Sequence, residues 1–138
     1  MESSPHLKRK YEQSDSHTRD LFDLLITESS KYCSDHTSVN MKEYHYRLQK
    51  KYEGGMGRKY QNYCLYTLTP SKKGISVHLR TEGRKITSKK IDIYYIGECS
   101  YLRGKGWVKF DVKNQPDIYE AIILIKKIYE DVLNHIDS

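Results

Sequence analysis

The feature that most restricts the fold of this chain is a strict alternation of apolar and polar side chains. Residues 75–80 read Ile-Ser-Val-His-Leu-Arg. Neighbouring side chains of an extended chain point to opposite sides, so this period of two predicts a strand with one buried and one solvated face. The same alternation recurs in residues 44–49 and 107–112.

Two flanking segments repeat apolar residues at helical spacing instead. Residues 16–33 carry a stripe of leucines, and Asp15 or Ser16 suits the N-cap of that helix. A second helix is expected to begin after Asn114, with Asp117 completing an acidic variant of the capping box. Its stripe is longer and consists of Ile118, Ile122, Ile125, Tyr129, Val132 and Ile136.

This order of elements predicts an α+β fold. We expect a mostly antiparallel sheet of about five strands, flanked by an N-terminal and a C-terminal helix packed on one face. Residues 60–69 and 91–96 are the remaining strand candidates, because they are rich in Tyr, Thr, Leu and Ile. The connections are expected at residues 34–40, 54–57, 70–74, 81–90 and 97–106.

With 138 residues, the chain suits one domain. We expect that domain over residues 16–138, preceded by a flexible, polar segment, 1–15. The three cysteines, Cys33, Cys64 and Cys99, are odd in number and favour a reducing compartment. No signal peptide or apolar run of membrane-spanning length is recognised, so a cytoplasmic location without membrane contact is expected.

The charge is concentrated in the middle of the chain. Residues 54–113 contain thirteen Lys or Arg and four acids, a net charge of +9, whereas residues 1–53 are neutral and residues 114–138 carry −3. A basic block of this kind favours an anionic partner, nucleic acid being the commonest. The alternative is a domain that simply has many exposed lysines.

The alternation also predicts which side chains share the solvated face of the sheet. If the apolar face packs on the helices, the opposite face presents His45, Arg47, Gln49, His78, Arg80, Trp107 and Lys109. Such a face could hold phosphates and stack a base on the indole. The alternative is an ordinary polar face, although an exposed tryptophan is less expected there.

The segment from Asn62 through Pro70-Ser71-Lys72-Lys73-Gly74 to Leu79 resembles the uncharacterised family catalogued as domain of unknown function 5655. The Gly-rich turn at 103–106, the strand 107–112 and the capped final helix add to the resemblance, which covers about residues 20–133. Members of that family are often appended to nuclease-like or restriction-type modules, and some are labelled predicted transport proteins. The resemblance therefore implies an accessory role near nucleic acid.

The sequence contains no recognisable catalytic motif. Glu82-Gly83-Arg84-Lys85 has the wrong spacing for the acid and lysine of a nuclease strand, and Cys33 with His36 lacks a second pair of zinc ligands. There is no phosphate-binding glycine loop of known type. We therefore expect no enzyme activity, no metal and no cofactor.

The leading hypothesis is an accessory domain that binds nucleic acid or another polyanion. The residues predicted to bind are Lys72, Lys73, Arg80, Arg84, Arg103, Lys105 and Trp107. Two alternatives stay open: a protein-interaction module that docks to a partner such as a restriction-type effector through a Tyr-rich edge, and a small anionic-ligand pocket under residues 97–106. Salt dependence distinguishes the leading hypothesis from these alternatives, because binding to a polyanion through its phosphates should weaken steeply with salt.

Overall fold

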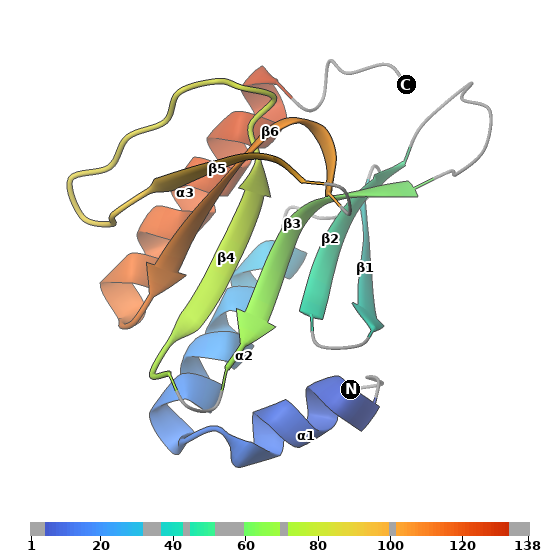
Figure 1. Ribbon diagram of the computed structural model, residues 1–138. Helices are drawn as coiled ribbons and strands as arrows, with labels where there is room; N and C mark the ends of the chain where they lie inside the picture. Colours follow the sequence, from blue (N-terminus) through green and yellow to red (C-terminus); the bar gives the residue numbers. More distant parts are fainter. Residues whose placement is uncertain are drawn as a thin grey trace.

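The computed structural model describes residues 5–31, 37–42, 45–51, 60–69, 72–99 and 102–132; side chains are left undescribed at 37–47, 50–51, 60–61, 97–99 and 102–105. Three helices and six strands are present in this part of the chain (Figure 1). The helices are α1 (Pro5–Gln13), α2 (Ser16–Ser30) and α3 (Gln115–Asp131). The strands are β1 (Thr37–Lys42), β2 (His45–Lys51), β3 (Tyr60–Leu68), β4 (Ile75–Arg80), β5 (Tyr94–Cys99) and β6 (Leu102–Val112).

The strands form one sheet in the order β1-β2-β3-β4-β6-β5. Every neighbouring pair is antiparallel. Helices α2 and α3 lie side by side across one face of the sheet (Figure 1). The predicted α+β fold with flanking helices is thus confirmed.

Both long helices begin at the predicted caps. The side chain of Asp15 accepts a hydrogen bond from the backbone N–H of Thr18 at 2.7 Å, and Asn114 accepts one from Asp117 at 3.0 Å. Each cap satisfies a backbone donor that the first helical turn leaves without an intrahelical partner. The Asp117 carboxylate in turn accepts from the backbone N–H of Lys113, which fixes the chain as it leaves β6.

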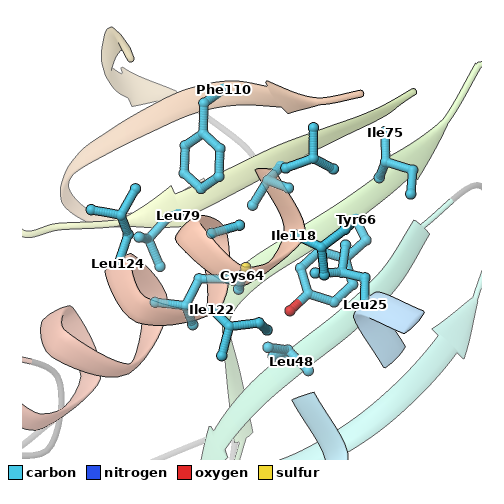
Figure 2. Close-up of a cluster of buried hydrophobic side chains, with 14 of the residues drawn as sticks. Leu25, Leu48, Cys64, Tyr66, Ile75, Leu79, Phe110, Ile118, Ile122 and Leu124 are labelled. Atoms are coloured by element: carbon cyan, nitrogen blue, oxygen red, sulfur yellow. The ribbon is translucent and has the colours of Figure 1, made fainter. Parts of the chain in front are cut away.

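The core lies between the sheet and the two long helices (Figure 2). The predicted apolar faces of β4 and β6 are fully inside it, and α3 contributes its isoleucine stripe. Ile75 pairs with Val112, Val77 with Phe110 and Leu79 with Val108, so alternate positions of the two strands stack on the same side. The period of two thus places every second side chain of these strands against the helices.

A β-bulge in β3 supplies an additional large side chain to the core. Leu48 pairs with Cys64 and Gln49 with Asn62, which leaves Tyr63 as the extra residue. Both Tyr63 and Cys64 are buried. The Tyr63 ring lies 5.3 Å, centroid to centroid, from that of Tyr129 on α3. The bulge therefore ties β3 to the C-terminal helix.

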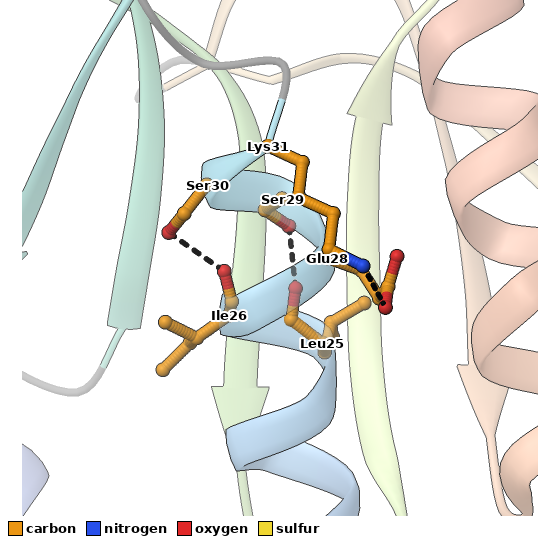
Figure 3. Close-up of polar contacts among 6 residues, drawn as sticks. All are labelled: Leu25, Ile26, Glu28, Ser29, Ser30 and Lys31. Atoms are coloured by element: carbon orange, nitrogen blue, oxygen red, sulfur yellow. Dashed lines mark hydrogen bonds and ion pairs between the residues drawn. The ribbon is translucent and has the colours of Figure 1, made fainter.

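The last turn of α2 is held by three side chains (Figure 3). Ser29 and Ser30 each donate to the backbone carbonyl four residues earlier, and Lys31 pairs with Glu28 at 2.8 Å. Ser29 is buried and its hydroxyl also lies 2.5 Å from the hydroxyl of Tyr66 on β3. Because the Ser29 proton goes to the Leu25 carbonyl, Tyr66 is the donor in this second bond.

The N-terminal segment differs from the sequence prediction. Residues 5–13, expected to be flexible, form helix α1. Leu7 is 1% exposed, and Tyr11 donates to the Asp23 carboxylate at 2.8 Å and packs against Phe22. Burial raises the pKa of the Tyr11 phenol, and the hydrogen bond to Asp23 raises it further. The apolar content of α1 is too small to show in a sequence pattern, but Leu7 and Tyr11 pack the helix against the main core.

Two strands also depart from the expected boundaries. The predicted loop at 34–40 contains the start of β1, and the predicted Gly-rich turn at 103–106 lies within β6. Both are strands because they pair with a neighbouring strand: Thr37 pairs with Lys50 of β2, and Leu102 pairs with Cys99 of β5. Residues 91–93, expected as a strand, precede β5. Polar and Gly-rich sequences carry little intrinsic β signal, so pairing decides their conformation.

Candidate anion-binding site

The connection between β3 and β4 lies unusually close to the end of β6. Gly74 has a φ of 111°, and a Cβ added there would lie 2.6 Å from the carbonyl oxygen of Val112. Only glycine accepts both this backbone angle and this approach. The position of Gly74 therefore brings the two preceding lysines, Lys72 and Lys73, beside Lys113, which follows β6.

These residues surround a pocket of about 330 Å³, which we call the lysine pocket. Its described lining consists of Thr69, Lys72, Lys73, Gly74, Ile75, Ser76, Asp111 and Lys113. The three lysines are exposed. The described lining thus combines three positive charges with one carboxylate, a formal charge of +2.

The N-terminal end of α2 forms hydrogen bonds to both segments that carry the lysines. The hydroxyl of Thr18, which is buried, accepts from the backbone N–H of Gly74 at 3.4 Å, and the His17 ring donates to the carbonyl of Lys113 at 2.9 Å. The hydrogen bond from the Thr18 backbone lowers the pKa of Asp15, and nearby Lys73 lowers it a little more. One helix end therefore positions both segments that carry the lysines.

The carboxylate of Asp111 has a fixed orientation. Asp111 and Ser76 are paired across β6 and β4, and the Ser76 hydroxyl donates to Oδ1 of Asp111 at 2.9 Å. Both side chains lie on the sheet face opposite the helices, because each is next in sequence to side chains that point into the core. The hydrogen bond therefore holds this carboxylate in place in the wall of the pocket.

The structure brings together only part of the predicted site. Lys72 and Lys73 share the lysine pocket. Arg84 is exposed but lies in the loop that follows the opposite end of β4, about six residues of strand away, or roughly 20 Å. The side chains of Arg103 and Lys105 lie outside the described residues.

Two predicted contact residues are buried, and the expectation that they are open to solvent is wrong. Arg80 is 6% exposed and pairs with Glu82 at 2.9 Å. Trp107 is 0% exposed and forms a second apolar cluster with Leu65 of β3 and Ile96 of β5. The indole lies on the face opposite the helices, as the alternation requires, but apolar side chains from other strands cover it.

The remainder of that face fits the expectation in part. His78, Lys109 and Gln49 are half-buried, and Gln49 donates to Asn62 at 2.8 Å. The side chains of His45 and Arg47 lie outside the described residues.

The sequence prediction missed Ser76, Asp111 and Lys113 in the pocket. Their signal was the pairing of β4 with β6, which joins residues 35 positions apart and is not visible in either strand alone. The sequence prediction also anticipated a Tyr-rich edge without naming the residues that form it. Tyr94 and Tyr95, at the start of edge strand β5, are 58% and 65% exposed.

Among the described residues, no group of three or more His, Cys, Asp or Glu side chains is arranged to hold a metal ion. In the same part of the chain, no helix combines the length and apolar character needed to cross a membrane.

No protein-family model matches the chain, and neither a curated protein nor a solved structure matches it. The resemblance to the family of domain of unknown function 5655 stays a prediction.

Proposed function

We propose that this chain is a non-enzymatic accessory domain that binds nucleic acid or another polyanion. One observation supports the proposal above all: three lysines from two segments distant in sequence converge on one pocket, whose described lining holds a single carboxylate. Holding like charges together is unfavourable in the free protein, and a phosphate relieves that repulsion. Two of these lysines, Lys72 and Lys73, are residues that the sequence already predicted to bind.

The surroundings of the pocket agree with this function. Thr69 brings a hydroxyl group to its lining, which can donate to a phosphate oxygen as lysines do, whereas the Ser76 hydroxyl donates to Asp111. The proposal changes the aromatic partner: exposed Tyr94 is better placed to stack a base than buried Trp107. For location we propose the cytoplasm, in keeping with the reduced, buried Cys64.

Binding of labelled single-stranded oligonucleotides, followed by fluorescence anisotropy at several salt concentrations, tests this function. The variant Lys72→Ala/Lys73→Ala should bind more weakly at low salt. Each lost phosphate contact should also flatten the dependence of log K on log salt by about 0.7, giving about 1.4 for the pair.

Lys127→Ala is the matched control, because Lys127 is exposed on α3, twelve residues after the helix begins at Gln115. It therefore lies roughly 18 Å along the helix from the end that follows Lys113. It should bind like the wild type. Absence of oligonucleotide binding at low salt, or an equal loss in the control, would contradict the proposed site.

A protein-interaction module is the second candidate, favoured by the exposed tyrosines. Tyr94 and Tyr95 lie next to each other on edge strand β5, so they flank the backbone that an added strand would pair with. A partner such as a restriction-type effector would add a strand there. Binding of that kind should depend little on salt and should fail in Tyr95→Ala while persisting in Lys72→Ala/Lys73→Ala.

A further inference from the structure

A second hollow adjoins the lysine pocket, on the side of β6 that faces β5. This hollow measures about 140 Å³, and its described lining consists of Lys90, Ile91, Asp92, Tyr94, Asp111, Lys113 and Asp117. Asp111 and Lys113 line both spaces. One molecule can therefore lie across the end of β6 and contact both hollows at once.

The two hollows differ in charge. The lysine pocket has a formal charge of +2, whereas the second hollow has two lysines and three aspartates, a formal charge of −1. An anionic group is thus favoured on the lysine side, and hydrogen-bond donors are favoured at the carboxylates. Asp111 stands at the boundary, with one oxygen fixed by Ser76.

An aromatic ring stands at the far end of this path. Tyr94 lines the second hollow and is 58% exposed, so a ring face is open to a flat ligand group. Tyr94 pairs with Lys109, two residues before Asp111 on β6. Strand geometry places Tyr94 and Asp111 about 8 Å apart, from roughly 6.6 Å along the strand and 4.8 Å across it.

The order of groups along the path is therefore cationic pocket, fixed carboxylate, exposed aromatic ring. A ribonucleotide presents the complementary order: phosphate, ribose hydroxyls, base. A carboxylate is a good acceptor for ribose hydroxyls, and a tyrosine ring stacks on any base.

We infer that the two adjacent hollows together bind one ribonucleotide unit, with its phosphate among Lys72, Lys73 and Lys113, its ribose hydroxyls on Asp111 and its base on Tyr94. This inference rests on the proposed function and specifies its ligand. The unit is supplied either by a free ribonucleoside 5′-monophosphate or by the phosphorylated end of an RNA strand.

Calorimetric titration of the full chain with four probes tests the inference: adenosine 5′-monophosphate, its 2′-deoxy counterpart, adenosine and inorganic phosphate. The ribonucleotide should bind tightest, by roughly tenfold over the deoxynucleotide, because a hydrogen bond to a charged acceptor is lost in the latter. Adenosine and phosphate should each bind more weakly than the nucleotides that contain them.

Asp111→Asn gives a signature that a merely structural role of Asp111 would not produce. It keeps an acceptor for the Ser76 hydroxyl but removes the negative charge. Inorganic phosphate should then bind more tightly, because the carboxylate no longer repels it. The ratio of ribonucleotide to deoxynucleotide affinity should fall toward one. Asp131→Asn, exposed at the end of α3, is the matched control and should change neither quantity.

Tyr94→Ala should weaken both nucleotides by a similar factor and leave phosphate binding unchanged. A short RNA with and without a 5′-phosphate separates the two ligand sources. If the protein prefers the phosphorylated RNA, and Lys72→Ala/Lys73→Ala abolishes this preference, the site binds RNA ends. If both RNAs bind equally well while the nucleotide binds saturably, the site binds the free nucleotide.

If oligonucleotides bind and need Lys72 and Lys73, but adenosine 5′-monophosphate does not bind saturably, the inference is overturned and the proposed function stands. Equal affinity for ribonucleotide and deoxynucleotide would overturn the role of Asp111. Failure of every phosphate-bearing probe would overturn both the inference and the proposed function.

Discussion

At the scale of single residues, the hydroxyl of Ser29 links helix α2 to the sheet. It is buried and lies 2.5 Å from the Tyr66 hydroxyl, whereas Ser30 makes the same backbone contact at the exposed surface (Figure 3). Ser29→Ala should lower the free energy of unfolding by about 1–3 kcal/mol, because a buried hydrogen bond between two elements is lost. Ser30→Ala, the matched control, should change it by less than about 0.5 kcal/mol. Chemical denaturation measures both values, and equal values would contradict the role of Ser29.

A second residue-scale prediction concerns the charge of Asp15. Its folded-state pKa is depressed, first by the hydrogen bond from the Thr18 backbone, so its carboxylate stabilises the fold above the unfolded-state pKa of about 3.9. That contribution is lost as pH falls through the folded-state pKa. Asp15→Asn keeps a capping acceptor but removes the charge. Its Tm should lie below that of the wild type at pH 7, and the two should converge as pH falls through the lowered folded-state pKa of Asp15. A constant difference over this range would exclude the charge as the cause.

Residue exposure was the least predictable property of the site. The alternation correctly assigns Trp107 and Arg80 to the face opposite the helices, yet both are buried there. Among the described residues, Leu65 of β3 and Ile96 of β5 pack against Trp107, and the alternation within one strand does not show these contacts. Lys72 and Lys73 were predictable, because a Lys-Lys-Gly turn places charged side chains at a surface whatever the rest of the chain does.

At the scale of elements, helix α1 shows how a few contacts fix a polar segment. Leu7 is its single buried residue, and it belongs to the main core. Leu7→Ala should reduce the free energy of unfolding by about 2–4 kcal/mol, because a buried leucine is replaced by a cavity. Its neighbour Lys8 is exposed, so Lys8→Ala is the control and should be near neutral. Thermal and denaturant unfolding provide the measurement, and a neutral Leu7→Ala would show that α1 does not stabilise the domain.

Elements with strong internal periodicity were predictable, and those made by pairing were not. Helix α3 and strand β4 each carry a repeat that matches one conformation, and α2 begins at a cap that the sequence displays. Strand β1 has the sequence Thr-Ser-Val-Asn-Met-Lys, in which only Val39 and Met41 are apolar, so its alternation is too short to identify it. It is a strand because it pairs with β2. The lysine pocket falls in the second category, since the partnership of β4 and β6 creates it.

At the scale of the whole molecule, the net charge of +6 should attract nucleic acid from a distance, while the lysine pocket holds it after contact. These effects separate kinetically. Lys8→Glu/Lys127→Glu changes two exposed residues on α1 and α3 and lowers the net charge by four, from +6 to +2. It should slow association by a few-fold at low salt and leave dissociation unchanged. Lys72→Ala/Lys73→Ala should chiefly accelerate dissociation, because it removes contacts that exist only in the complex.

Stopped-flow measurement with a labelled oligonucleotide resolves the two rate constants. The effect of the distant charges should vanish near physiological salt, where the screening length is about 8 Å, whereas the effect of the pocket lysines should persist in the dissociation rate. Faster dissociation in Lys8→Glu/Lys127→Glu would place part of the contact surface on the helices. Unchanged dissociation in Lys72→Ala/Lys73→Ala would mean that net charge, rather than the pocket beside β6, accounts for binding.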